Sequence, residues 1–372
     1  QHREPPPPCV DWEHREPSPV FLCVPSRARM GPSRVMLDCA CEQSEAPRAG
    51  DGMAKTGVII ANTGSPAAPT SEAVSAYLRS FLVDPRICPM NPRLWSFILE
   101  HFVIPKRAPV SARKYASIWT EAGSPLDATM KSLADKLESA LRASGEDVAV
   151  ARAASYGSPS VGEALRGLLD RGCGHIIAIP LYPQSAFSTT GAVRDKLDEA
   201  LAALERKPEV HFVENYFRHD AYVDAVAETI RASGFGRGDE DKLLFAFHSI
   251  PASDIRGGDS YPEQTAWTAQ AIADRIGLSD DAWRIGYQSR FDKSRSWLGP
   301  SVNAVLEEFP ERGADLFVVA PNFSIDCLET LYDIDVVLRR RCEDAGRRLR
   351  YVTCLNDSDS QVSLMTAVIK GA

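Results

Sequence analysis

The sequence predicts an α/β protein with two Rossmann-like lobes, each a four-stranded parallel sheet flanked by helices, and a cleft between the lobes. Short β-rich apolar runs alternate with amphipathic helical stretches, which is the pattern of βαβ units. Four of these runs fall on each side of a break near residues 216–240. The length of 372 residues also exceeds one average domain, so two lobes are the expected arrangement.

Eight segments are expected to be strands, and GVIIAN, the first, carries a clean strand signal. They are 57–62, 148–155, 175–181, 209–215, 243–248, 284–288, 315–320 and 350–354. Helices are expected at 124–144, 160–171, 190–205, 220–233, 262–276, 301–309 and 327–345. No GxGxxG follows the first strand, so dinucleotide binding has no support.

The N-terminal stretch differs from the rest of the chain. It begins QHREPPPPCVDWEHREPSP, is crowded with proline and charge, and has neither helical nor strand periodicity. We expect residues 1–52 to be a disordered or wrongly assigned extension, with Met53 as the functional start. The first lobe would then span 53–216 and the second 217–372, with the last helix free to pack back on the first lobe.

Composition narrows the class of protein. A hydrophobic share of 44% and a charged share of 25% are those of a globular protein, and a net charge of −8 argues against a nucleic-acid partner. Nine cysteines without a CxxC pair fit no disulfide framework, which is typical of a reduced, cytoplasmic environment. Segment 81–105, FLVDPRICPMNPRLWSFILEHFVIP, is either a helix packed on the core or an exposed apolar lip suited to a hydrophobic substrate or a membrane surface.

Two segments carry the strongest chemical signals. In KLLFAFHSIPASD, an apolar run ends in His248, and functional residues collect where parallel strands end, although a lone histidine there is more often structural. In PNFSIDCLETLYDID, the spacings of Asp326, Glu329 and Asp333 place three carboxylates on one helical face. That stripe is either a solvated face with a helix-dipole complement or a path for protons and hard divalent cations.

Two further segments suggest a ligand site. IPLYPQSAFSTTG offers Tyr182 and a hydroxyl-rich turn, whose serines and threonines are ordinary N-caps or receptors for a ligand carboxylate. YQSRFDKSRSWLGP brings Trp297 after a basic loop, where it is either a core residue or a stacking wall for a flat aromatic ligand. Each segment alone is weak.

Taken in order, these segments resemble the ferrochelatase family from about residue 57 to the C-terminus. The series is GVIIANTGSP, FLVDPRICP, RKYASIWTEAGSPL, YPQ with STTG, FHSIP with GGDSYPEQ, YQSR with WLGP, DCLETLYDID and CLNDSDSQV. The resemblance implies a two-lobed, Rossmann-like lyase of haem biosynthesis that inserts ferrous iron into a porphyrin, with the lip at 81–105 contacting a membrane at its inner face.

The resemblance also implies roles for individual positions. His248 matches the active-site histidine that takes protons from the pyrrole nitrogens, and Glu329 matches the acidic residue on the opposite side of the porphyrin. Together with Asp333, the next member of an acidic ridge, these residues are the expected metal contacts. The positions that match the lining of the porphyrin site are Tyr156, Tyr182, Ser188, Thr189, Trp297 and Arg86.

Ferrous iron is expected as a substrate, without a permanently bound cofactor. Some ferrochelatases carry a [2Fe–2S] cluster on C-terminal cysteines, but none of the 18 residues after Cys354 is a cysteine, so no cluster is expected. Protoporphyrin IX is the expected porphyrin, with coproporphyrin as the alternative. The rival interpretations are a cobalt or nickel tetrapyrrole chelatase and, from another class, a non-catalytic haem-binding protein.

Overall fold

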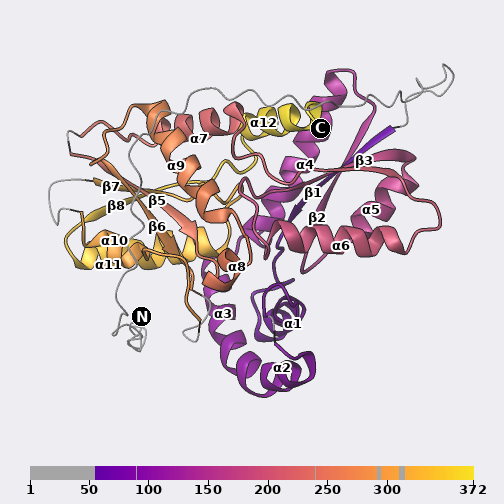
Figure 1. The fold of residues 1–372 in the computed structure, drawn as a ribbon, viewed down its shortest axis with the longest axis horizontal. Coiled ribbons are helices and arrows are strands. Elements are labelled where there is room, and N and C mark those ends of the chain that lie inside the picture. Colours follow the sequence, from indigo (N-terminus) through magenta and orange to yellow (C-terminus); the bar gives the residue numbers. More distant parts are fainter. Residues whose placement is uncertain (1–54, 89, 239, 291–294, 310–314) are drawn as a thin grey trace, which may run out of the picture. The chain divides into compact units, whose positions relative to one another are not determined.

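The computed structural model describes residues 55–88, 90–238, 240–290, 295–309 and 315–372. All of them belong to one compact unit, Asp51–Ala372. The extension predicted at 1–52 lies outside the described residues. Two four-stranded parallel sheets with helices on their faces make up the fold (Figure 1), which confirms the predicted fold class.

The first sheet has the order β2–β1–β3–β4 and is parallel throughout. Its strands are β1 (Lys55–Asn62), β2 (Val148–Ala154), β3 (Cys173–Pro180) and β4 (Glu209–Phe212). Val58, Ile59 and Ile60 of the central β1 are fully buried, as expected for a strand covered on both faces. Gly57 allows β3 to approach closely, because a Cβ atom there would lie 2.8 Å from Ile176 Cδ1.

Helices cover both faces of this sheet. α4 (Pro125–Ala143) packs with β1 residues Val58 and Ile60 on one face. α5 (Val161–Asp170) and α6 (Thr190–Ala202) pack with Ile59 on the other face. A capping box between Ser160 and Glu163 defines the start of α5, since it satisfies backbone groups that the first turn leaves free.

The second sheet repeats the first, with the order β6–β5–β7–β8. Its strands are β5 (Lys242–His248), β6 (Trp283–Gln288), β7 (Asp315–Val319) and β8 (Arg348–Val352). α7 (Asp220–Ala232) and α9 (Tyr261–Ile276) share a core with one face of this sheet. The other face packs with α10 (Val302–Leu306), the π-helix η2 (Glu329–Leu338) and α11 (Arg339–Asp344). The short α8 (Ala252–Arg256) follows β5.

A separate group of helices contains segment 81–105. α1 (Ser71–Leu82), α2 (Pro92–Ile98), the π-helix η1 (Leu99–Val103) and α3 (Ile104–Ile118) have their own small core. The outer side of this group carries Leu94, Phe97 and Phe102, which are 55%, 56% and 55% exposed. The segment was expected to be either a packed helix or an exposed apolar lip. It combines both, because some of its side chains pack in the small core and others are exposed.

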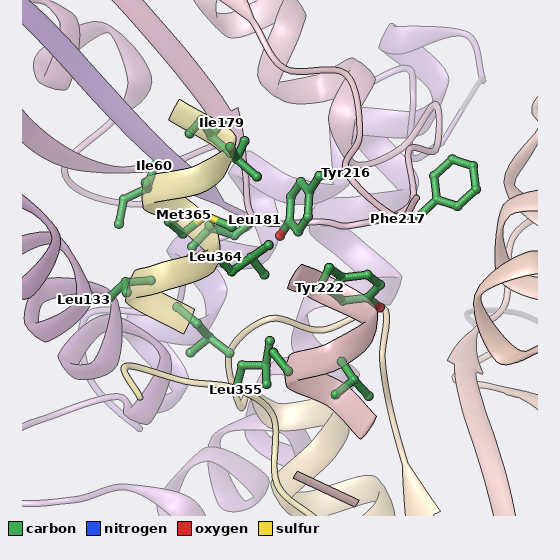
Figure 2. Packing of buried hydrophobic residues seen from close by; sticks show 14 of the residues in the cluster. Ile60, Leu133, Ile179, Leu181, Tyr216, Phe217, Tyr222, Leu355, Leu364 and Met365 are labelled. Atoms are coloured by element: carbon green, nitrogen blue, oxygen red, sulfur yellow. The ribbon is translucent and has the colours of Figure 1, made fainter. Parts of the chain in front are cut away.

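The two lobes share one hydrophobic core. α12 (Asp359–Lys370) contributes Leu364 and Met365, and Figure 2 shows these side chains among Ile60, Leu133 and Ile179 of the first lobe. The same cluster continues through Tyr216, Tyr222 and Leu355, and on to Phe245 and Phe317 of the second sheet. Because a packed core deforms little, this continuity holds the two sheets in a fixed position relative to each other.

None of the helices in the described ranges is long and apolar enough to cross a membrane.

Candidate active site

The topology indicates where a site belongs in each lobe. In the order β2–β1–β3–β4, the connections leave β1 and β3 toward opposite sides, and the second sheet repeats this at β5 and β7. Ligands of open parallel sheets bind outside the carboxyl ends of the strands at such switch points. Tyr182 follows β3, His248 ends β5, and the segment leading to Glu329 follows β7, so three predicted site residues lie at these positions.

The His248 ring is held by the backbone of the following residue. Its Nδ1 lies 2.7 Å from the carbonyl oxygen of Ser249, which can only accept a hydrogen bond. Nδ1 therefore donates, and in the neutral ring Nε2 keeps its lone pair. The ring edge contacts Phe323, with 6.4 Å between ring centroids. The imidazole is half-buried and oriented, with one nitrogen available to accept a proton.

The segment after His248 pairs with the segment that contains Trp297. The Ser249 hydroxyl donates to the Leu298 carbonyl at 2.8 Å, and Leu298 N–H donates to the Ile250 carbonyl at 2.9 Å. Pro251 forms an antiparallel bridge with Trp297. The structure thus brings two predicted segments together, and Trp297 is half-buried beside Arg295, whose guanidinium carbon lies 5.2 Å from the indole centroid.

The acidic helix differs from the expected α-helix at 327–345. It is a π-helix, Glu329–Leu338, continued by α11. Asp326 precedes it and does not share the predicted stripe: Thr330 and Tyr351 hydroxyls donate to Asp326 Oδ1 at 2.8 and 2.5 Å, and Asn356 Nδ2 donates to Oδ2 at 2.8 Å. This carboxylate is a buried structural acceptor. The stripe of three carboxylates was therefore wrong, and two remain.

Glu329 stands among tyrosines of the first lobe. Burial raises the pKa of Tyr77 and of Tyr115 well above the ordinary value of 10.0, and the negative charge of Glu329 raises both further. The pKa of Tyr182 is also raised, mainly by burial, with Glu329 among the contributors. Tyr77 and Tyr115 were missed at the sequence level, where the only signal was the tyrosine of RKYASIW. These phenols stay protonated and add no negative charge near the carboxylate.

Asp333 forms an ion pair with the first lobe and interacts electrostatically with Glu329 and His248. Burial raises the pKa of the Asp333 carboxyl, and nearby Glu329 raises it too, whereas Lys114 and His248 lower it. Lys114 Nζ on α3 donates to Asp333 Oδ1 at 3.1 Å. Glu329 and His248 thus both act electrostatically on the Asp333 carboxyl.

Tyr156 and Tyr182 are buried, and both hydroxyls are engaged. Tyr182 OH lies 2.5 Å from the Thr63 hydroxyl and donates to Asn62 Oδ1 at 3.2 Å. Tyr156 OH donates to Asp84 Oδ2 at 2.8 Å. Burial is the largest cause of the raised pKa of each phenol. Asn62 ends β1 and Thr63 follows it, both within the GVIIANTGSP segment, although neither residue was predicted as a site residue.

Arg86 lies across the start of α6. Its guanidinium forms a bidentate ion pair with Asp195, with Nη2 donating to Oδ1 at 2.8 Å. It also covers Gly191, where a Cβ atom would meet Nη1 at 2.6 Å. Asp195 is 109 residues away in sequence, so no local pattern could have revealed this pairing.

Ser188 and Thr189 lie in the turn before α6, and both are half-buried. The Thr189 hydroxyl donates to the Ala186 carbonyl at 3.5 Å. The turn is tied to the second lobe, because Phe187 N–H donates to Asp259 Oδ2 at 2.7 Å and Ser185 N–H donates to Gln264 Oε1 at 2.9 Å. The GGDSYPEQ segment thereby positions the STTG turn.

In the part of the chain that the structure describes, no three His, Cys, Asp or Glu side chains group as a metal-holding cluster. Glu329 and Asp333 nevertheless supply carboxylate oxygens, which are ligands that suit a hard divalent cation.

Comparisons with known proteins identify the family of the chain. The family model described as Ferrochelatase matches residues 55–372. A ferrochelatase of Vibrio cholerae is 40% identical over 322 residues, covering 85% of this chain and 98% of the relative. A ferrochelatase of Methylococcus capsulatus is 40% identical over 319 residues, covering 85% and 96%.

A solved structure supports the fold alone. SirB from Bacillus subtilis, determined with Fe³⁺, superposes with a TM-score of 0.52 at 9% identity and covers 85% of this chain and 94% of that chain. Identity over nearly the whole length of the ferrochelatase relatives carries the family assignment. On the match over residues 55–372 and the 40% identity to these relatives, the chain belongs to the ferrochelatase family.

Proposed function

We propose that this chain inserts ferrous iron into a porphyrin, protoporphyrin IX, to make haem with release of two protons. The observation that carries the proposal is the His248 imidazole, whose Nδ1 donates to the Ser249 carbonyl and whose charge, like that of Glu329, acts on the Asp333 carboxyl. Iron and porphyrin are both substrates, and no permanently bound cofactor is required.

Metal insertion requires a proton acceptor near the macrocycle. A free-base porphyrin loses two N–H protons as the divalent ion enters, so charge balances overall. A neutral imidazole, with an ordinary pKa of about 6.5, accepts a proton well at cellular pH. In the proposed reaction, Nε2 of His248 takes protons from the pyrrole nitrogens, and Nδ1 remains bonded to Ser249.

Glu329 and Asp333 serve as the metal side of the site in this proposal. Carboxylate oxygen binds ferrous iron weakly enough to release it again, unlike thiolate or clustered imidazole ligands. The phenols of Tyr77 and Tyr115, whose pKa values burial and Glu329 raise, stay protonated and add no negative charge to that of the carboxylates. Iron would therefore pass between oxygen ligands toward the macrocycle.

The remaining predicted residues would hold the porphyrin. The half-buried Trp297 would offer aromatic surface, the buried Tyr156 and Tyr182 would support the wall of the site, and Ser188 and Thr189 would offer hydroxyls to a propionate. Arg86 already pairs with Asp195, so a propionate would either replace this carboxylate or share the guanidinium with it. A rigid site that favours a bent macrocycle lowers the barrier, because a planar porphyrin presents its nitrogens poorly to the metal.

Anaerobic incubation with ferrous iron and a porphyrin tests the proposal. We expect catalytic loss of the free-base absorbance, with protoporphyrin IX used at a higher kcat/KM than coproporphyrin. A higher kcat/KM for coproporphyrin would show that coproporphyrin is the substrate instead of protoporphyrin IX. A stoichiometric spectral shift without turnover would replace the enzyme by a haem-binding protein, and turnover only with cobalt or nickel would indicate a different chelatase.

We also propose a cytoplasmic protein that touches the inner face of the membrane through segment 81–105. The support is the exposed apolar surface of α2 and η1, which includes Leu94, Phe97 and Phe102. Apolar side chains on a short helical segment insert at the lipid interface without spanning it. Such contact would bring the lip to the membrane phase, where a hydrophobic porphyrin is found.

A further inference from the structure

Lys114 makes a contact that proton transfer at His248 does not use. It lies on α3, in the group of helices that contains segment 81–105, and its Nζ donates to Oδ1 of Asp333 on η2 at 3.1 Å. The same ammonium lies 5.0 Å from the ring centroid of Tyr332, the residue before Asp333. Both side chains of the ion pair are about one-third exposed, 33% for Lys114 and 31% for Asp333.

This position is electrostatically crowded. Asp333 is faced by Glu329 from η2, by Lys114 from α3 and by His248 from β5. Glu329 and Asp333 attract any cation, and the ammonium of Lys114 already neutralises one of the two charges. A divalent cation that binds Asp333 must compete with this ammonium for the same oxygen.

We propose that Lys114 is a positioning residue that acts as a built-in counter-ion of the acidic pair, which an incoming divalent metal displaces from Asp333. This inference rests on the proposed function. The Tyr332 ring offers the displaced ammonium a second partner, because an aromatic face attracts a cation. The exchange moves no covalent bond: one cation leaves a carboxylate oxygen as another arrives.

Such a counter-ion weakens metal binding and helps metal release. Without it, Asp333 and Glu329 would hold the arriving ion more tightly. A partly exposed ion pair of this kind contributes little to stability, so its presence beside the acidic pair is better explained by an effect on cation binding. The effect should be screened by salt, since the pair is reached by solvent.

The test compares Lys114→Met and Lys114→Gln with the wild-type protein in anaerobic steady-state assays with ferrous iron. We expect the KM for iron to fall about two- to fivefold, in line with the weak pairing of exposed ions, while the KM for porphyrin is unchanged and kcat does not rise. The difference should shrink at high ionic strength. Lys114→Arg should behave as wild type, and Lys106→Gln, an exposed lysine on the same helix, serves as the matched control.

Unchanged or higher KM for iron in both neutral variants would overturn the inference, and so would a Lys114→Arg variant that behaves like them. An unchanged KM for porphyrin shows that the variants retain the folded site. Binding of Zn²⁺ alone to the porphyrin-free protein, followed by calorimetry, should tighten in the same neutral variants. If the wild-type protein does not insert iron at all, the proposed function is wrong. If the wild-type protein inserts iron and the Lys114 variants have the same KM for iron, only the role of Lys114 is wrong.

Discussion

Backbone contacts decide which atoms of the candidate site are free to react. Nδ1 of His248 is 2.7 Å from the Ser249 carbonyl, while the Ser249 hydroxyl and N–H are bonded to Leu298 and Gln288 carbonyls. A histidine whose Nδ1 donates to a backbone carbonyl presents Nε2 as the base. The assignment of a proton acceptor thus follows from three hydrogen bonds around one residue.

Glu329→Gln should slow iron insertion about 100-fold or more, because an uncharged amide neither attracts the metal nor accepts a proton. Porphyrin binding should change less than about threefold, since the amide keeps the shape of the side chain. Steady-state kinetics combined with a fluorescence titration of porphyrin would measure both quantities. Glu343→Gln, on the exposed side of α11, is the control. An equal loss in binding and turnover would make Glu329 a structural residue.

At the scale of elements, the acidic helix shows what a residue pattern can predict. Residues four apart are neighbours in an α-helix and remain so in the wider π-helix, so Glu329 and Asp333 share a face as expected. The π geometry itself was not predicted, because the pattern of ETLYDIDVVL fits either helix. Asp326 does not share this face, because it precedes the helix and two of its three hydrogen-bond donors, Tyr351 and Asn356, are at least 25 residues away.

Replacing Leu94, Phe97 and Phe102 by serine should weaken binding to phosphatidylglycerol-containing vesicles at least about tenfold, because three exposed apolar side chains no longer reach the lipid interface. Vesicle sedimentation measures this directly. The rate of iron insertion with detergent-dispersed porphyrin should stay the same, since these exposed side chains are not part of the small core of this helix group. Val336→Ser, also exposed but on η2, should bind as wild type. Unaltered vesicle binding of the triple variant would remove the membrane role of the lip.

At the scale of the whole molecule, most of the fold could be predicted from the sequence and the long-range contacts could not. Each of the eight strands lies at its predicted position, because uninterrupted apolar runs mark strands buried on both faces. β4 ends at Phe212, short of the expected 215, where an edge strand alternates exposed and half-buried residues. Pairings such as Arg86 with Asp195 or Lys114 with Asp333 depend on tertiary structure, so their partners were missed.

The two lobes are joined by polar contacts at the rim of their shared core. Ser132 and Lys136 on α4 donate to Asp357 Oδ2 at 2.6 and 2.7 Å, just before α12 begins. These two donors, Lys136 first and then Ser132, lower the pKa of the Asp357 carboxyl below its ordinary 3.8. A lowered folded-state pKa means that the stabilisation is present above the ordinary value and is lost as the pH falls through the lowered one.

Asp357→Asn should therefore reduce the free energy of unfolding by about 1–2 kcal/mol near neutral pH, a modest loss because Lys136 is partly exposed. The deficit relative to wild type should shrink as the pH falls below 3.8. Urea unfolding across this range measures it, with Asp344→Asn, an exposed aspartate on α11, as the control. A deficit that is independent of pH would show that the Asp357 charge does not join the lobes.

The most direct measurement of the central claim is anaerobic iron insertion by His248→Ala, run beside a titration of the same protein with porphyrin. The imidazole is proposed to accept the pyrrole protons, so the variant should lose insertion by about 100-fold or more. It should still bind porphyrin with nearly wild-type affinity, because Tyr156, Tyr182 and Trp297 remain in place. Full turnover by His248→Ala would contradict the account.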